Sequence, residues 1–247
     1  MENILEVKNV NVYYTEKKSL FSGKNVRKHV LKDVSFTMQE GEILGLVGES
    51  GCGKTSLAKA ILGMQKQYDG EIKLACNNPQ MVFQDPYGSL NPAKKIGWIL
   101  EEPLRMKGGY TAKQRTEKVV EMLEKVGLDK KCVSHYPSEL SGGQRQRVAI
   151  AAALLCDTKF LIADEPVSAL DVTIQAQIIR LLLKLHKEMG ISILFISHDL
   201  RVVYQMCDRV IIMQNGEIIE QGDIDHIYQN PQTEYTKLLL EAADIGE

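Results

Sequence analysis

A glycine-rich segment that ends in a lysine and a hydroxyl residue is the first candidate for chemistry in this sequence. It reads Gly48-Glu-Ser-Gly-Cys-Gly-Lys-Thr55 and follows an apolar run that ends at Val47. The glycines let backbone N–H groups converge on phosphate oxygens, and the helix that follows adds its positive end. The segment predicts binding of a nucleoside triphosphate, with Lys54 on the phosphates and Thr55 on Mg²⁺. The predicted phosphate-binding residues are Gly48, Ser50, Gly51, Cys52, Gly53, Lys54, Thr55 and Ser56.

Two neighbouring carboxylates, Asp164 and Glu165, come directly after the apolar run Phe160-Leu-Ile-Ala163. A carboxylate at the end of a buried strand costs free energy unless it has a partner, so we interpret Asp164 as a ligand of Mg²⁺, held directly or through water. We interpret Glu165 as the general base that takes a proton from the attacking water, a role that contributes about 10² to 10⁴ in rate. This pair predicts hydrolysis of the bound triphosphate.

The segment Leu140-Ser-Gly-Gly-Gln-Arg-Gln-Arg-Val-Ala149 predicts a second site for an anion. Ser141 is a favoured N-cap residue, and the N–H groups that begin a helix attract negative charge. One chain has no second triphosphate to place there. This surplus predicts that two chains associate, each binding the triphosphate held by the other.

Together, these three segments resemble the ATP-binding cassette (ABC) family, and the resemblance extends from Leu5 to about Gln221. It implies an α/β fold, namely a P-loop NTPase core of the ABC ATPase type with an antiparallel β subdomain and a helical subdomain. It also implies ATP and Mg²⁺ as cofactors. In the family, two cassettes meet head to tail, which would place Ser141, Gly143 and Gln144 of one chain at the nucleotide of the other. ATP would then close the dimer, and hydrolysis would remove the contact that closed it.

The resemblance assigns two further polar side chains to the γ-phosphate. Gln84, in Met81-Val-Phe-Gln-Asp85, matches the glutamine that touches Mg²⁺ and the attacking water. His198, in Phe195-Ile-Ser-His-Asp199, matches the switch histidine, which hydrogen-bonds the γ-phosphate and orients the general base. Both side chains are therefore expected to act in hydrolysis.

Two more positions follow from the same resemblance. Asp171, in Ser168-Ala-Leu-Asp171, matches the loop that crosses the dimer interface in the family. Tyr14 aligns with the aromatic residue that stacks on adenine, although Tyr13 is adjacent. We therefore expect Asp171 and Tyr14 to contribute to nucleotide binding.

Longer strings resemble one branch of the family, the ATPases of oligopeptide, dipeptide and nickel importers. These are Gln84-Asp-Pro-Tyr-Gly-Ser-Leu-Asn-Pro92 and Ser168-Ala-Leu-Asp-Val-Thr-Ile-Gln-Ala-Gln177. Glu102-Pro-Leu104 and the basic insertion Lys17–Lys24 resemble the F-type ATPase of those systems, which pairs with a paralogous D-type subunit. The resemblance implies a heterodimer, or a pair of this chain with itself, beneath two membrane permease subunits.

That arrangement would place the chain as a peripheral protein on the cytoplasmic face of the cell membrane, with an extracytoplasmic substrate-binding protein acting indirectly. The surface near Gln84 to Trp98 would dock a short cytoplasmic helix of a permease. Trp98 has a second interpretation, an ordinary core aromatic, and the sequence does not decide between the two.

The C-terminal stretch departs from the peptide-importer pattern. Those ATPases usually continue past a His-Pro-Tyr-Thr segment into a longer tail, sometimes with cysteines for an iron–sulfur cluster, whereas this chain has Asn230-Pro-Gln-Thr-Glu-Tyr-Thr-Lys237 and ends at Glu247. No cluster is expected. The short tail is similar to that of nickel and metallophore importers, so the cargo stays open between metal chelates and peptides.

Composition sets limits on the function. The 247 residues are 44% hydrophobic, enough for a full core, and 30 basic against 32 acidic side chains leave a net charge of −2. No whole-molecule field draws the chain to nucleic acid, so none is expected as a partner. The apolar runs are shorter than the roughly twenty residues of a membrane span, so we expect the transport path in another chain. The N-terminus lacks an export-signal pattern, so we expect a cytoplasmic protein.

The cysteines Cys52, Cys76, Cys132, Cys156 and Cys207 are scattered, which indicates neither a zinc site nor a disulfide framework. Cys52 lies inside the phosphate segment, where a lowered pKa and redox sensing are conceivable. We favour the simpler interpretation of a small tolerated side chain.

Apolar spacing predicts the elements that position these residues. Alternation predicts strands at Leu5–Tyr14 and Val34–Met38, and Asn215-Gly216 predicts a hairpin. Helices are expected at Lys54–Met64, Ala112–Val126 with Thr111 as N-cap, Thr173–Met189 and Tyr235–Ala243, and buried strands at Glu42–Val47, Phe160–Ala163 and Ile191–Ile196. We interpret the chain as one nucleotide-binding domain with a helical subdomain at about 87–157 and a short tail at about 223–247.

Other functions are weighed against transport. A soluble ABC protein of DNA repair or translation would carry long insertions or a second cassette, and neither is present. An exporter ATPase is disfavoured by the importer-type string at Gln84. A binding module without hydrolysis is disfavoured because Glu165, His198, Lys54 and Ser141 are all intact.

Overall fold

The computed structural model describes residues 2–16 and 26–243. Contacts divide the chain into two compact units, the first formed by Met1–Ala75 and Leu194–Glu247 and the second by Cys76–Ile193. The basic insertion Lys17–Lys24 lies outside the described residues. The segment 87–157 belongs to the second unit, and the tail from residue 223 belongs to the first. In the described part, no helix has the length and apolar character needed to span a membrane.

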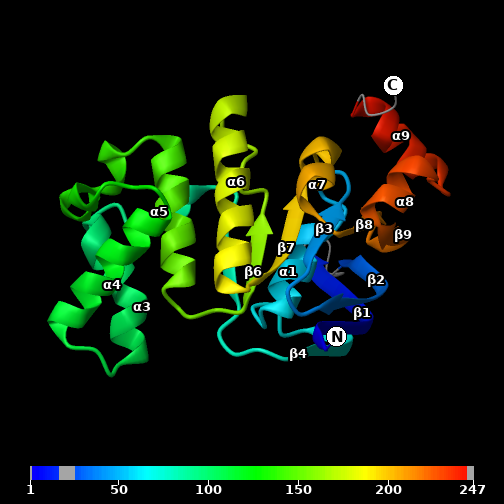
Figure 1. Cartoon of the computed structure of the whole chain (residues 1–247). Helices are drawn as coiled ribbons and strands as arrows, with labels where there is room; N and C mark the ends of the chain where they lie inside the picture. Colours follow the sequence, from blue (N-terminus) through cyan, green and yellow to red (C-terminus); the bar gives the residue numbers. More distant parts are fainter. Residues whose placement is uncertain (1, 17–25, 244–247) are drawn as a thin grey trace, which may run out of the picture. The chain divides into compact units, whose positions relative to one another are not determined.

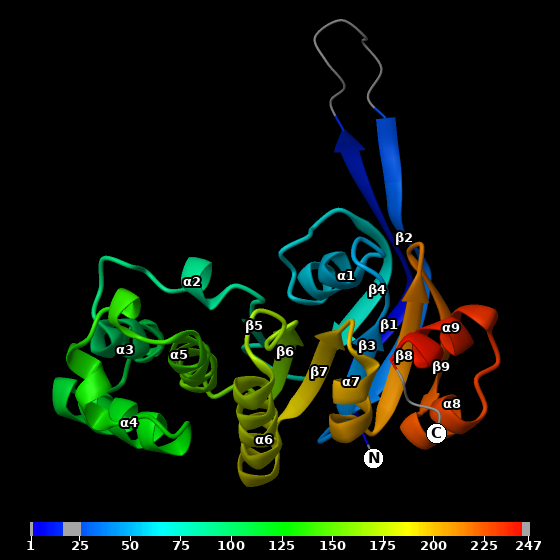
Figure 2. The ribbon, with the colours of Figure 1, turned by 90° about the horizontal axis from the view of Figure 1, so that it is seen from above.

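The first unit contains an antiparallel layer in which β1 lies between two neighbours. The strands are β1 (Asn3–Glu16), β2 (Val26–Gln39) and β4 (Tyr68–Leu74), in the order β2-β1-β4. Figure 2 shows β1 and β2 as a long paired ribbon. A register shift between Val7 and Val10, where Asn9 has φ 51°, lets both valines face the core although they are three positions apart. The predicted antiparallel β layer is confirmed.

The same unit holds strands that lead to the phosphate segment. Buried β3 (Ile43–Val47) pairs in parallel with β8 (Arg209–Gln214), which turns through Asn215-Gly216 into antiparallel β9 (Glu217–Asp223). The predicted hairpin is confirmed. Both turn residues have positive φ, 51° and 86°, as its tight turn requires. The remaining elements are α1 (Lys54–Ile61), α7 (Leu200–Met206), α8 (Ile224–Gln229), α9 (Glu234–Ala242) and most of β7 (Ser192–Ser197).

The second unit is mainly helical (Figure 1). Its two strands, β5 (Gln80–Val82) and β6 (Phe160–Asp164), pair in parallel. Its helices are α2 (Pro86–Ser89), α3 (Ile96–Lys107), α4 (Ala112–Lys125), α5 (Gly142–Leu154) and α6 (Val172–Met189), with short 3₁₀ turns at Lys130–Ser134 and Pro137–Glu139. The alternation of buried strands and helices along the chain confirms the predicted α/β class.

Helix α4 shows how the sequence fixes these elements. Thr111 Oγ1 accepts a hydrogen bond from the Gln114 N–H, and Gln114 Oε1 accepts one from the Thr111 N–H, so the predicted N-cap forms a full capping box. The helix buries Val119, Met122 and Leu123 on one face. Gly127, with φ 73°, follows the end of the helix, where the left-handed conformation favours glycine.

Candidate functional site

The phosphate segment forms a tight loop between β3 and α1. Gly53 is the N-cap of α1, with φ 114°, and it makes no side-chain cap to the donors of the first turn. A Cβ on Gly48 would lie 2.2 Å from the Met213 carbonyl oxygen, so only glycine fits there. Backbone N–H groups at an uncapped helix start are suited to phosphate oxygens.

The buried Lys54 ammonium holds this loop in shape. It is 6% exposed, and its Nζ donates to the Gly48 carbonyl at 2.6 Å and to the Glu49 carbonyl at 3.0 Å. Ser50, Gly51 and Thr55 are exposed and Ser56 is half-buried, so the predicted phosphate-binding residues lie on one short stretch around the α1 N-terminus. The loop combines a positive charge with backbone donors, as triphosphate binding requires.

Cys52 packs beneath the phosphate loop. Its Sγ lies 4.0 Å from Lys54 Nζ, and it would be 2.8 Å from a Cβ on Gly48. Burial raises the pKa of the Cys52 thiol, and the charge of Lys54 offsets this only in part. A thiol with a raised pKa is a poor nucleophile, which supports the interpretation of Cys52 as a small packing residue.

The two adjacent tyrosines of β1 have different surroundings. Tyr13 stacks on His29 of β2 with ring centroids 4.2 Å apart, and the Arg27 guanidinium lies 5.6 Å from its ring centre. Successive strand residues point to opposite faces, so Tyr14 lies on the other face. Because Tyr13 already has ring partners, Tyr14 remains the better candidate for an adenine contact.

His198 is exposed at the end of β7, directly before α7. Asp199 caps α7 by accepting from the Arg201 N–H at 3.0 Å, and its own N–H donates to Ser197 Oγ at 3.0 Å. Burial acts to raise the pKa of Asp199, but hydrogen bonds and the charge of Arg201 outweigh it, so this pKa lies below its usual value. The capped helix start thus fixes the backbone that carries His198.

In the second unit, the candidate general base has an unusual backbone. Asp164 ends β6 and is 5% exposed, whereas Glu165 has φ 47°, a left-handed conformation that costs a non-glycine residue about 1–3 kcal/mol. Gln84 Nε2 donates to Glu165 Oε2 at 3.2 Å. The structure therefore brings two predicted site residues into direct contact, at a strained position of the kind that clusters at active sites.

The loop after Glu165 is held by a residue to which the sequence analysis assigned no role. Gln175 Nε2 donates to the carbonyls of Val167 and Leu170, each at 3.0 Å. Asp171 caps α6 by accepting from the Ile174 N–H at 3.0 Å. The sequence signal that could have identified Gln175 is an amide side chain one turn after the N-cap of a helix. Asp171 has a structural role whether or not it also reaches a partner's nucleotide.

The second anion candidate begins α5 with its cap already filled. Ser141 Oγ accepts from the Gln144 N–H at 3.3 Å, and Gln144 Oε1 accepts from the Ser141 N–H at 2.9 Å. Ser141 and Gln144 are exposed, but Gly143 is buried, and a Cβ there would lie 2.6 Å from Ile174 of α6. Gly143 therefore lets α5 approach α6 closely, which the sequence analysis did not anticipate.

The predicted Mg²⁺ ligands fit that ion by their chemistry. Thr55 supplies a hydroxyl, Gln84 an amide and Asp164 a buried carboxylate, and hard cations prefer such oxygen donors. Thr55 belongs to the first unit, and the other two belong to the second.

Comparisons with known proteins agree with this chemistry. The family model of ABC transporters matches residues 31–168. The chain is 46% identical over 245 residues to a dipeptide transport ATP-binding protein of Haemophilus influenzae, covering 93% of this chain and 75% of that protein. It is 45% identical over 264 residues to an oligopeptide transport ATP-binding protein of the same organism, covering 100% of this chain and 80% of the other.

Among solved structures, the chain matches the dimeric post-hydrolysis state of the ATP-binding cassette MJ0796, bound to ADP and Pi. The TM-score is 0.75 with 28% identity, covering 89% of this chain and 98% of that one. The predicted ABC ATPase fold is thereby confirmed.

Proposed function

The chain belongs to the ABC transporter family and is an ATPase, and we propose that it drives the import of dipeptides or oligopeptides through separate membrane subunits. The names of the two Haemophilus influenzae relatives, at 46% and 45% identity, support peptide cargo. Neither name mentions a metal chelate. Import by a membrane complex would hold the chain at the cytoplasmic face of the membrane.

We assign the roles in hydrolysis to the predicted site residues of the first and the second unit. Lys54 and the loop amides bind the phosphates, and Thr55, Gln84 and Asp164 supply oxygens to Mg²⁺. Glu165 accepts the proton of the attacking water, and His198 contacts the γ-phosphate. The hydrogen bond from Gln84 to Glu165 is the observation that carries this assignment, because it couples the sensor amide to the general base.

Dimer closure would complete the site. The exposed Ser141 and Gln144 and the first-turn N–H groups of α5 would contact the γ-phosphate held by a second cassette. ATP favours the closed pair because only that state adds this second set of donors. The dimeric structure of MJ0796 supports such a pair. We propose a paralogous D-type subunit as the partner, or a second copy of this chain.

A cavity in the second unit would receive a short cytoplasmic helix of a permease. Its volume is about 670 Å³, and its apolar lining includes Phe83, Leu90, Ile99 and Met106. Phe83 is 38% and Met106 85% exposed, so apolar surface is accessible there. An apolar groove of this kind suits the apolar face of an amphipathic helix.

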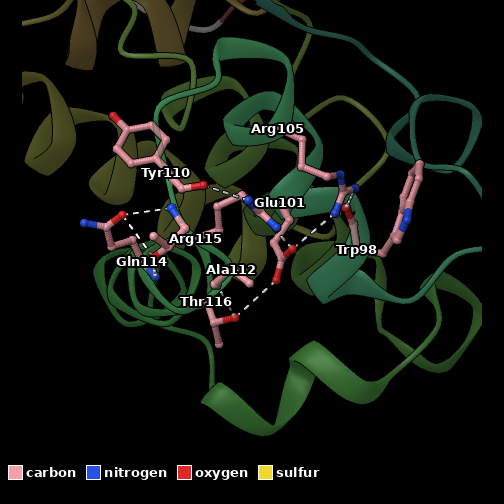
Figure 3. Close-up of polar contacts among 9 residues, drawn as sticks. Trp98, Glu101, Arg105, Tyr110, Ala112, Gln114, Arg115 and Thr116 are labelled. Atoms are coloured by element: carbon pink, nitrogen blue, oxygen red, sulfur yellow. Dashed lines mark hydrogen bonds and ion pairs between the residues drawn. The ribbon is translucent and has the colours of Figure 1, made fainter.

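Trp98, at the end of the segment expected to dock a permease, is an exposed aromatic and not a core one, although it does not line this cavity. It is 38% exposed and lies between Lys94, whose Nζ is 4.8 Å from the ring centre, and Arg105, whose guanidinium is 4.5 Å away. Figure 3 shows that Arg105 also donates to the Trp98 carbonyl and pairs with Glu101. The ring is thereby held at the surface, which suits a contact residue.

A single substitution tests the catalytic assignment. Glu165→Gln in the purified full chain should lower ATP turnover by about 100-fold or more while ATP binding persists, because the amide cannot accept the proton. Glu188→Gln, at an exposed position of α6, is the matched control and should turn over at the wild-type rate. Wild-type turnover in Glu165→Gln would refute the assignment.

Cargo is tested in reconstituted transporters. The chain is combined in liposomes with candidate permeases, a D-type ATPase and a substrate-binding protein. The rate of ATP hydrolysis is then measured in three conditions: with the binding protein empty, loaded with a dipeptide, and loaded with a nickel chelate. Stimulation by the dipeptide alone supports the proposal. Stimulation by the chelate alone moves the function to metal import, and failure of any assembly to form favours a soluble ABC ATPase.

A further inference from the structure

The C-terminal helices contact the phosphate loop through one tyrosine. Figure 2 shows α8 and α9 beside β8 and β9. The hydroxyl oxygen of Tyr235, in α9, accepts a hydrogen bond from the Glu49 N–H at 3.2 Å. Glu49 is the second residue of the phosphate loop, and its carbonyl accepts from Lys54 Nζ at 3.0 Å. Both backbone groups of Glu49 are therefore held, one by the phosphate-binding lysine and one by the tail.

A second tyrosine connects the tail to the switch histidine. Tyr228, in α8, donates its hydroxyl hydrogen to the carbonyl of Leu200, the first residue of α7 and two positions after His198. Its ring packs against Tyr204 of α7 with centroids 4.5 Å apart. The backbone that carries His198 thus also has a partner in the tail.

The connection between α8 and α9 is itself fixed. Glu220 of β9 accepts from the Gln232 N–H at 2.8 Å, from the Thr233 N–H at 3.2 Å and from Thr233 Oγ1 at 3.1 Å. Burial acts to raise the pKa of Glu220, but these hydrogen bonds and one from Thr236 outweigh it, so the carboxylate stays ionised at neutral pH. Charged acceptors make stronger hydrogen bonds, so Glu220 fixes the segment of chain between Tyr228 and Tyr235.

We propose that α8 and α9 form a clasp in which Tyr235 positions the phosphate loop for ATP binding and Tyr228 positions the switch histidine for hydrolysis. Both are positioning residues, and the inference rests on the nucleotide site proposed above. Loop residues cost conformational entropy when ATP orders them, and a loop already held by Tyr235 has less to lose. By linkage, ATP must stabilise the clasp by the same factor by which the clasp strengthens ATP binding.

The two hydroxyls predict different kinetic effects. Tyr235→Phe should raise the Kd of the full chain for a fluorescent ATP analogue with Mg²⁺ about threefold to tenfold, the loss of one ordinary hydrogen bond. Tyr228→Phe should leave this Kd within about twofold but lower turnover at saturating ATP by a similar factor. Tyr204→Phe keeps the ring contact with Tyr228 and is the control for both.

Amide hydrogen exchange supplies a readout that a structural role would not change. In the wild-type chain, ATP with Mg²⁺ should slow exchange in α9, and this slowing should disappear in Tyr235→Phe, which retains the ring. Exchange in α9 that does not respond to ATP in the wild type, or an unchanged Kd in Tyr235→Phe, would overturn the clasp. Lys54→Ala separates the clasp hypothesis from the proposed nucleotide site, because wild-type ATP affinity in that variant would refute the nucleotide site itself.

Discussion

Two helix N-termini in this chain are candidates for the same anion, yet they begin in opposite ways. Helix α1 starts at Gly53, which has φ 114° and offers no side-chain cap. Helix α5 starts at Ser141, whose side chain forms a complete capping box with Gln144. The first turn of α1 therefore receives no cap from its own N-cap residue, whereas that of α5 is stabilised by its own residues.

The difference indicates what each end binds and when. A capped helix start is fixed before any ligand arrives, which suits a surface that meets a nucleotide carried by another molecule. An uncapped start depends on the loop before it, and here the Lys54 ammonium and the Tyr235 hydroxyl hold that loop. The donors of α1 are thus kept in place by the side chain of its own first residue and by a hydroxyl from α9.

The largest expected effect comes from removing the charge at the uncapped end. Lys54→Ala should raise the Kd for ATP about 10-fold to 100-fold, because the variant loses a charged hydrogen bond to phosphate and the support of the Gly48 and Glu49 carbonyls. Equilibrium binding of a fluorescent ATP analogue with Mg²⁺ measures it. Lys59→Ala, on the exposed side of α1, should bind as the wild type does. If Lys54→Ala also did so, the phosphates would not be held at this loop.

Sequence patterns predicted both helix ends because the information is local. The glycine spacing before Lys54 and the Ser-to-Gln spacing of the capping box each lie within a few residues. The same holds for the Asn215-Gly216 hairpin. Strand β4 was not predicted, because it is an edge strand that contains Gly70 and has mostly exposed or half-buried residues, so its alternation is weak. Helix α3 was not predicted either, and Pro103 within it suggests a break.

Contacts between distant residues carried no such signal. The contact between Tyr235 and Glu49 joins residues 186 positions apart, and nothing in either segment points to the other. The hydrogen bond between Gln84 and Glu165 spans 81 positions. The sequence analysis had assigned a role to each of these two residues but no distance between them. The left-handed backbone of Glu165 was equally invisible, since glutamate has no preference for it.

The next effect concerns closure at the capped end. Ser141→Arg should spare ATP binding by the full chain but prevent the ATP-stabilised dimer, because a bulky side chain would occupy the approach of the second nucleotide. Dimer formation is measured by sedimentation in the Glu165→Gln background with ATP. Ser141→Ala is the control for the cap, and it should cost about 1 kcal/mol of unfolding free energy. Closure that survives in Ser141→Arg would mean that α5 does not face a partner's nucleotide.

The smallest expected effect distinguishes the two glycines that serve these ends. Gly143→Ala should lower the free energy of unfolding by about 1–3 kcal/mol, because its Cβ would lie 2.6 Å from Ile174. Truncating the neighbour, in Gly143→Ala with Ile174→Ala, should recover part of this loss, measured by a double-mutant cycle in urea. Gly142→Ala, whose Cβ would lie 3.3 Å from Leu170, is the milder control.

At the uncapped end, the same double-mutant cycle is run with Gly53→Ala and Leu31→Ala. Shortening Leu31 should not recover the stability lost in Gly53→Ala, because the φ of 114° at Gly53 strains any side chain. Rescue at Gly53 would mean that crowding, and not backbone conformation, requires glycine at the uncapped end.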